Sequence, residues 1–294
     1  LADQINHCER NFPKMSETKG SQAELALREQ IRQAKKIVVK VGTSTLTYEN
    51  GRTNIGNVDH LCRSLANQMN QGKELVLVSS GAIGMGVGKL RLSEKPRSIR
   101  AKQAVAAVGQ CELMNIYSKT MADYNYVVAQ ILLTKDDIDD KLTRVNICNT
   151  FAALLEREIL PVVNENDTVS TREIYHNGTF GDNDNLSAVV ADLIGADLLI
   201  LLSDIDGLYT SDPRCDEGAS IIHYVAEIDD TIAASAGQEG THRGTGGMRS
   251  KISAARIASA AGIPIVIANG SNNRVVDQII EGERVGTLFA AAKI

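Results

Sequence analysis

The sequence predicts an α/β fold in three layers, with a mostly parallel central sheet covered by helices on both faces. Short apolar runs such as "KKIVVKVG", "ELVLVS" and "DLLILLS" indicate strands that are buried along their whole length. Segments with helical periodicity separate these runs, and this alternation is typical of a parallel sheet. Because ligands bind such sheets at the carboxyl ends of the strands, we expect the site there.

The predicted elements follow one another in a regular order from Lys36 onward. The first strand is followed by a helix whose buried face carries Val58, Leu61, Leu65 and Met69. A second strand then leads through a glycine-rich segment into a long helical region from about 98 to 124. The later strands are expected at 126–134, 159–164, 197–203 and 263–268, and the later helices at 144–158, 185–195 and 248–262.

The first 35 residues differ from the rest of the chain. They are polar and without periodicity until a helix is predicted to begin at about Ala23, in "AELALREQIRQAKK". We treat residues 1–35 as an N-terminal extension without a catalytic role, and residues 36–294 as the main domain.

Composition excludes several classes of protein. The chain has 294 residues, 43% of them hydrophobic, and a formal net charge of −5, without the basic stripe that nucleic-acid binding needs. It contains no apolar run of the roughly 18 to 20 residues that span a membrane. Its five cysteines are scattered singly, which favours neither a zinc cage nor disulfides. We therefore expect a cytoplasmic protein with a small-molecule partner.

The segment "SSGAIGMGVGK", residues 79–89, fits neither of two familiar phosphate-binding motifs. A P-loop would need glycine at Ile83 and a hydroxyl at Leu90, and a dinucleotide fingerprint would need glycine at Lys89. A glycine-rich turn without a ligand is one interpretation. The other is an anion site, because a strand, a turn at Ser80-Gly81 and a new helix would point backbone N–H groups at a ligand.

Two lysines stand where lysine is unusual. Lys40 lies among valines in the first strand, although lysine is rarely buried without a partner. It either belongs to an edge strand and reaches water, or delivers charge to the carboxyl edge of the sheet. Lys251 follows "GTGG" in the first turn of a helix, where a cation is unfavourable unless an anion lies nearby. An exposed lysine after a flexible loop is the alternative.

Acidic and amide side chains gather in "NENDT", residues 164–168, and "GDNDN", residues 181–185. Helix capping accounts for one of them. The excess indicates a pocket that hydrogen-bonds a small polar substrate and positions cations. Metal binding by Asp182 or Asp184 is the weaker alternative, and we assign no metal ligand.

Taken together, these features resemble the amino acid kinase family, and within it the glutamate 5-kinases. The matching phrases run in the order of the family from about Lys36 to Phe289. They are "VVKVGTSTLT", "VSSGAIGMG", "AAVGQ", "QILLT", "PVVNENDTV", "FGDNDNLSA", "LLSDIDGLYTSDPR", "GTGGMRSK" and "VGTLF". The ordered set is far more specific than any single motif.

The resemblance implies transfer of a phosphoryl group from ATP, with Mg²⁺, to the γ-carboxylate of L-glutamate, the first step of proline biosynthesis. It makes Lys40, Lys251 and Asp184 catalytic, the lysines neutralising the phosphoryl charge and the aspartate orienting them. The implied glutamate contacts are Ser80, Gly81, Asp167, Asp182 and Asn183. The implied ATP contacts are Lys40, Gly42, Ser203, Asp204, Thr245, Gly246, Gly247, Met248, Arg249, Ser250 and Lys251.

The chemistry agrees with this assignment. A carboxylate is already a nucleophile, so the reaction needs no general base and depends on positioning and charge stabilisation. The histidines form no constellation in the sequence: His7, His60, His176, His223 and His242. We expect Mg²⁺ to be held mainly by the phosphates of ATP.

The resemblance also implies inhibition by proline and assembly into a homodimer or homotetramer. Many bacterial members continue into a C-terminal PUA domain, which we do not expect in this chain. Three alternative functions were considered, and two of them remain open. The chain could phosphorylate another acceptor, such as N-acetylglutamate, aspartate, carbamate or UMP, or it could be an amino acid sensor without turnover. A nicotinamide-dependent dehydrogenase fails on the missing fingerprint.

Overall fold

The fold was analysed in a computed structural model, which describes residues 17–48, 51–169, 183–211, 218–229 and 247–292, together with Pro213, Asp216 and Ile232. Side chains are described from residue 22 onward. None of the helices in these ranges is both long and apolar enough to cross a membrane.

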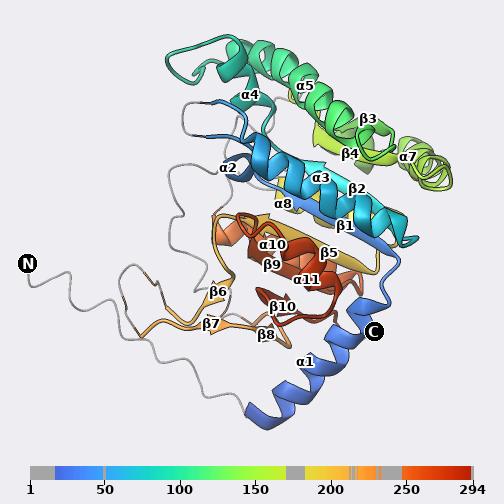
Figure 1. The fold of residues 1–294 in the computed structure, drawn as a ribbon, viewed down its shortest axis with the longest axis vertical. Helices are drawn as coiled ribbons and strands as arrows, with labels where there is room; N and C mark the ends of the chain where they lie inside the picture. The colour runs from blue at the N-terminus through green and yellow to red at the C-terminus, as the bar shows by residue number, and fades with distance from the viewer. Residues whose placement is uncertain are drawn as a thin grey trace, which may run out of the picture.

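The centre of the molecule is an eight-stranded sheet with the strand order β3-β4-β2-β1-β5-β9-β10-β8 (Figure 1). The six strands from β3 to β9 in this order are parallel, and β10 is antiparallel to β9. The prediction of a mostly parallel sheet is confirmed. The strands are β1 (Lys36–Val41), β2 (Glu74–Ser79), β3 (Val128–Leu133), β4 (Leu160–Glu165), β5 (Leu198–Ser203), β8 (Tyr224–Val225), β9 (Ile265–Asn269) and β10 (Thr287–Phe289). A separate two-stranded sheet pairs β6 (Leu208–Tyr209) with β7 (Ile221–Ile222).

Helices cover both faces of the large sheet. They are α1 (Glu17–Arg32), α2 (Thr43–Leu46), α3 (Ile55–Asn70), α4 (Ala82–Lys89), α5 (Ile99–Ala122), α6 (Lys135–Asp139), α7 (Lys141–Leu155), α8 (Asn183–Ile194), α10 (Met248–Ala260) and α11 (Val275–Ile280). Alternate residues of β1 enter two apolar clusters: Ile37 and Val39 pack with α3, α5 and α11, and Val38 packs with α7, α8 and α10. This is the three-layer arrangement that the apolar strands predicted.

Not every strand is buried as predicted. Most residues of β3 are only partly buried, because β3 forms the edge of the sheet. The short strands β6, β7, β8 and β10, of two or three residues each, were not anticipated, since so few residues show no periodicity.

The glycine-rich segment after β2 contains one turn and one helix. Gly81 has φ of 110°, a conformation that other residues rarely adopt, and precedes α4. The glycines beyond it allow close packing of α4 against neighbouring segments. A Cβ atom on Gly86 would overlap the carbonyl oxygen of Val105, and one on Gly109 would overlap that of Ala82. The predicted order of strand, turn and helix is therefore confirmed, and Gly86, with Gly109 on the partner helix, lets α4 approach α5 closely.

Helix α1 is anchored at the end of the sheet far from α5 (Figure 1). It begins at Glu17, earlier than the predicted Ala23, because its first turns carry no apolar residue that would mark a face. Arg28, only 3% exposed, donates to Glu24 at 2.9 Å and to the carbonyl of Glu283 at 2.7 Å. Arg284 forms a bidentate pair with Glu24. The division between an extension and a main domain stays a prediction.

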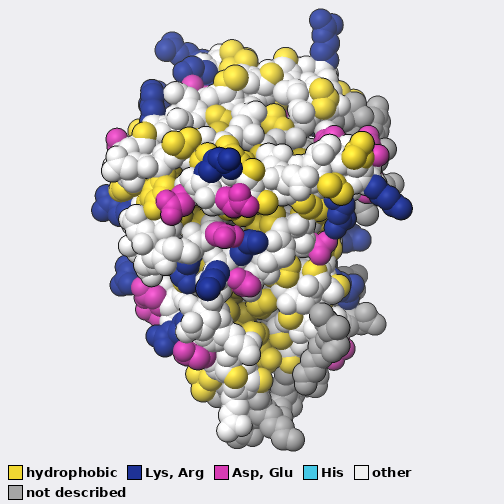
Figure 2. All heavy atoms as spheres, turned by 90° about the vertical axis from the view of Figure 1, so that its right-hand side faces the viewer, with side chains coloured by type: hydrophobic (Ala, Val, Ile, Leu, Met, Phe, Trp, Pro, Cys, Tyr) yellow, Lys and Arg dark blue, Asp and Glu magenta, His cyan; other side chains and the backbone are white. Residues whose placement is uncertain are grey.

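The surface carries charges of both signs. Figure 2 shows lysines and arginines interspersed with aspartates and glutamates on one face of the molecule, with apolar side chains between them. This face has no continuous basic stripe of the kind that follows a phosphate backbone.

Candidate active site

Lys40 lies at the centre of the sheet, one residue before the end of β1. Its neighbours across the sheet are Val78 on β2 and Leu201 on β5. It is 5% exposed, and its Nζ lies 2.6 Å from Oδ1 of Asp184. The interpretation of Lys40 as an edge-strand lysine is therefore wrong, because β1 has a partner on both sides.

Asp184 joins two lysines from different elements. It lies in the first turn of α8 and is fully buried. Its Oδ1 faces Lys40, and its Oδ2 lies 3.2 Å from Nζ of Lys251 on α10. The hydroxyl of Ser250 donates to the same Oδ2 at 2.7 Å. The structure thus brings the three predicted catalytic residues together, and two ammonium groups against one carboxylate leave one positive charge in excess.

The surroundings of Asp184 hold it in the ionised form. Burial by itself raises the pKa of a carboxyl group. Here the charges of Lys40 and Lys251, with hydrogen bonds from Lys40 and Ser250, outweigh burial and hold the pKa of Asp184 well below its usual range. Asp184 is therefore suited to hold the two ammonium groups, and not to exchange protons near neutral pH.

Helix α10 brings Lys251 into the site. Gly247 precedes the helix in an extended conformation, and within the described part of the chain no side chain caps it. Lys251 is the fourth residue of α10, where its charge opposes the helix dipole, and Asp184 compensates for this. The sequence predicted an anionic ligand as the reason for this lysine, whereas the structure supplies a protein carboxylate. The lysine is 5% exposed, so the exposed-loop alternative is wrong.

Next to the charged group lies a set of neutral side chains. The amide nitrogen of Asn183 donates to Oγ of Ser80 at 2.7 Å and to Oδ1 of Asn164 at 2.9 Å. Asn164, the last but one residue of β4, donates in turn to Oε1 of Gln110 on α5 at 3.0 Å. Sequence reasoning named Ser80 and Asn183 but missed Gln110, although "AAVGQ" was among the matching motifs.

Two glycines shape the edge of the site. Gly42 follows β1, and a Cβ atom there would lie 3.6 Å from Nζ of Lys40, so glycine leaves the side of the ammonium open. Gly81 follows Ser80, whose backbone N–H donates to the carbonyl of Val41 at 3.0 Å. This bond holds the turn after β2 against the end of β1.

The other predicted site residues occupy the same edge or lie outside the description. Ser203 ends β5 and donates to Asp204 at 3.1 Å, while Asp167 lies in the turn after β4. Met248 and Arg249 open α10. Asp182, Thr245 and Gly246 fall outside the described residues. Within the part of the chain that is described, no three His, Cys, Asp or Glu side chains gather as a metal site.

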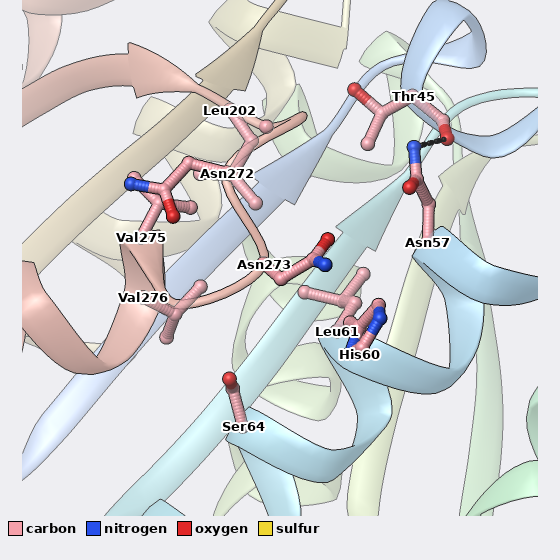
Figure 3. Close-up of a pocket in the computed structure, with 11 residues that line it drawn as sticks. Thr45, Asn57, His60, Leu61, Ser64, Leu202, Asn272, Asn273, Val275 and Val276 are labelled. Carbon is pink, nitrogen blue, oxygen red and sulfur yellow. Dashed lines mark hydrogen bonds between the residues drawn. The ribbon is translucent and has the colours of Figure 1, made fainter.

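A separate depression lies on the opposite face of the sheet, between α3 and α11 (Figure 3). Its lining includes Thr45, Asn57, His60, Asn272 and Asn273, and Asn57 donates to the carbonyl of Thr45 at 3.0 Å. None of the predicted site residues lines it. This depression and the charged cluster are thus different places.

Comparison with known proteins decides the family. The sequence profile of the amino acid kinase family matches residues 35–269. The chain belongs to the amino acid kinase family. The kinase is 54% identical over 267 residues to a glutamate 5-kinase of Clostridium perfringens, covering 91% of this chain and 99% of the relative. A glutamate 5-kinase of Clostridium tetani is 53% identical, with 90% and 98% covered.

A solved structure supports the fold of this kinase. The UMP kinase of Bacillus anthracis superposes with a TM-score of 0.60, covering 88% of this chain and 97% of that one. Its sequence identity is 16%, so the likeness concerns the fold alone.

Proposed function

We propose that the chain transfers the γ-phosphoryl group of ATP to the γ-carboxylate of L-glutamate, forming γ-glutamyl phosphate at the start of proline biosynthesis. The relatives of about 50% identity, matched over nearly their whole length, are glutamate 5-kinases. The observation in this chain that carries the proposal is the buried carboxylate of Asp184 between Lys40 and Lys251.

The two lysines act on the phosphoryl side. One oxygen of the substrate carboxylate forms a bond to the γ-phosphorus of ATP. The bond between the γ-phosphorus and the oxygen that bridges it to the β-phosphorus breaks, and ADP leaves. Charge on the transferring group and the departing oxygen is stabilised by preorganised cations in a buried site. Lys40 and Lys251 supply those cations, and Asp184 keeps both ammonium groups in place without neutralising them fully.

The residues around the lysines fit a nucleotide. No side chain of the described residues caps the N-terminus of α10, so the backbone N–H groups of Met248 and Arg249 can face phosphate oxygens. Gly42 leaves space beside Lys40. We assign ATP contacts to these elements and to Ser203 and Asp204 at the end of β5. The hydroxyl of Ser250 faces Asp184 and the carbonyl of Gly247, and its backbone N–H donates to the same carbonyl at 3.1 Å. The assignment of Ser250 to ATP therefore rests on the resemblance to the family.

Mg²⁺ would accompany the nucleotide, bound mainly by its phosphate oxygens. The ion would neutralise charge on the phosphates. Within this chain, Asp184 is bound by two lysines and a serine, an arrangement that favours a role in holding the lysines over a role as metal ligand.

The neutral side chains form the acceptor side. Ser80, Gly81 and Asn183 lie where β2 and α8 meet, and we assign them, with Asp167 and Asp182, to the binding of L-glutamate. Proline would compete with glutamate if both use this pocket. A homodimer or homotetramer and a cytoplasmic location are further parts of the proposal, by analogy with the family.

The test is ATP consumption by the purified chain with Mg²⁺, with hydroxylamine present to trap an acyl phosphate. L-glutamate, N-acetyl-L-glutamate, L-aspartate and UMP are offered separately. We expect turnover with L-glutamate alone and formation of the hydroxamate. Turnover with a different acceptor would overturn the assigned substrate while keeping the lysine roles, and no turnover with any acceptor would favour an amino acid sensor.

A further inference from the structure

A relay of three buried amides connects helix α5 to the acceptor side of the site. Gln110 on α5 is 7% exposed, Asn164 on β4 is 2% exposed and Asn183 on α8 is 9% exposed. Asn183 donates to Asn164, and Asn164 donates to Gln110. Gln110 itself donates outward to Oε1 of Gln130 on β3, at 3.5 Å. Four elements of the fold thus contribute to one line of hydrogen bonds.

The relay has a direction. Each amide has a donor end and an acceptor end, and each uses its nitrogen to donate to the next amide, from Asn183 toward Gln130. Both N–H groups of Asn183 are used, one on Asn164 and one on Ser80. Its Oδ1 is buried and has no hydrogen-bond partner among the described residues. The relay therefore leaves Oδ1 of Asn183 as an acceptor without a donor in the described part of the chain.

A buried acceptor needs a donor, because an unsatisfied polar group costs free energy. L-glutamate at neutral pH has a single donor group, its α-ammonium, since both of its carboxylates can only accept. If the amide of Asn183 were reversed, the same position would present N–H groups and would repel the ammonium. Binding of the amino group thus depends on the orientation of Asn183.

We propose that Gln110 is a positioning residue for L-glutamate: by accepting from Asn164, it sets the direction of the relay and so turns Oδ1 of Asn183 toward the α-ammonium. This inference rests on the proposed function for its substrate. Gln110 lies one residue beyond Gly109, where α5 is packed against α4 so closely that a Cβ atom would overlap the carbonyl of Ala82. The close packing of α5 against α4 therefore fixes the position of Gln110.

The experiment compares three variants of the full chain. Gln110→Met keeps the size of the side chain and removes its acceptor, whereas Gln110→Glu keeps an acceptor for Asn164. Gln103→Met, two turns earlier on α5 and outside the relay, is the matched control. For each, we would measure the KM values of L-glutamate and ATP, and the inhibition constant of glutarate, which has both carboxylates but no ammonium. Circular dichroism and thermal unfolding monitor the fold.

We expect Gln110→Met to raise the KM of L-glutamate about tenfold, the loss typical of a hydrogen bond to a charged group. The KM of ATP and the inhibition constant of glutarate should stay within about twofold of wild type, the scatter expected for groups that do not interact. Gln110→Glu and Gln103→Met should resemble wild type.

Other outcomes separate this inference from the proposed function. An active wild type with an unchanged KM of L-glutamate in Gln110→Met would overturn the role of Gln110 alone. An equal rise for glutamate and glutarate would also overturn it, because general loosening of the site would not depend on the ammonium. Loss of activity in Gln110→Glu equal to that in Gln110→Met would do the same. A wild type without glutamate-dependent turnover would instead overturn the proposed function.

Discussion

Asn183 and Asp184 are adjacent in the first turn of α8, yet they belong to two chemically different halves of the site. Asp184 binds two lysines and forms a charged half between β1 and α10. Asn183 binds Ser80 and Asn164 and forms a neutral half between β2 and β4. The first turn of one helix therefore divides the site into two sides. A side that stabilises phosphoryl charge lies next to a side that selects an amino acid by hydrogen bonds.

The substitution expected to lower stability most tests the charged half. Asp184→Asn leaves two buried ammonium groups without their shared counterion, and breaking a buried ion pair costs about 3–5 kcal/mol. We expect the free energy of unfolding to fall by this amount, measured by urea denaturation. Asp192→Asn is the matched control, since it lies on the same helix and breaks a half-exposed pair with Arg144, typically worth less than about 1 kcal/mol. Equal losses in both variants would contradict the role of Asp184 as a buried counterion.

The same pair of proteins gives a pH test. Lys40 and Lys251 hold the pKa of Asp184 low against the effect of burial, so its stabilisation is complete above the unfolded pKa of about 4 and is lost as the pH falls through the folded value. The gap in unfolding free energy between wild type and Asp184→Asn should be constant between about pH 5 and 8 and narrow below about pH 4. The measurement is urea denaturation at a series of pH values. A gap that fails to narrow below about pH 4 would show that the lysines do not hold the pKa of Asp184 low.

Removing one cation tests catalysis more than folding. Lys40→Ala should lower kcat by about 10²- to 10³-fold, because one preorganised charge is lost from the transition state. The fold should persist, since Lys251 still pairs with Asp184. Lys36→Ala, at the other end of β1, should leave kcat near wild type. Steady-state kinetics at saturating ATP and L-glutamate measure both. A folded Lys40→Ala enzyme with near-normal turnover would remove Lys40 from the mechanism.

The two halves also differ in how much the sequence could predict. Lys40 and Lys251 stand out because a lysine among valines or at a helix start is unusual by itself. Gln110 gives a weaker signal: a single polar residue in the buried stripe of α5, beside Gly109 and Leu113. Nothing local shows that its partner is Asn164, 54 positions away, because that contact exists only once β4 lies beside β2 and under α5.

The fold shows the same division between local and long-range information. The long strands and helices were predicted because their apolar periodicity is local. The glycines after β2 were harder to interpret, because a glycine needed for close packing and a glycine needed for a ligand look alike in a sequence. Gly86 and Gly109 are explained only by the approach of α4 to α5. Gly81 alone has the left-handed conformation that the turn requires.

The substitution expected to change stability and KM least tests the neutral half. Ser80→Ala removes one acceptor from Asn183, whose amide still donates to Asn164, so the unfolding free energy should fall by only about 1 kcal/mol. The KM of L-glutamate should rise about fivefold, since a freed amide spends part of its time misaligned, while the KM of ATP should not change. Thr120→Ala serves as the control, because it removes a hydroxyl on α5 that donates to the carbonyl of Ile116 on the same helix. A rise in the KM of ATP as large as that of L-glutamate would show that the two halves are coupled. In that case the division of the site at the first turn of α8 would be wrong, and the charged and neutral side chains would have to be treated as one unit.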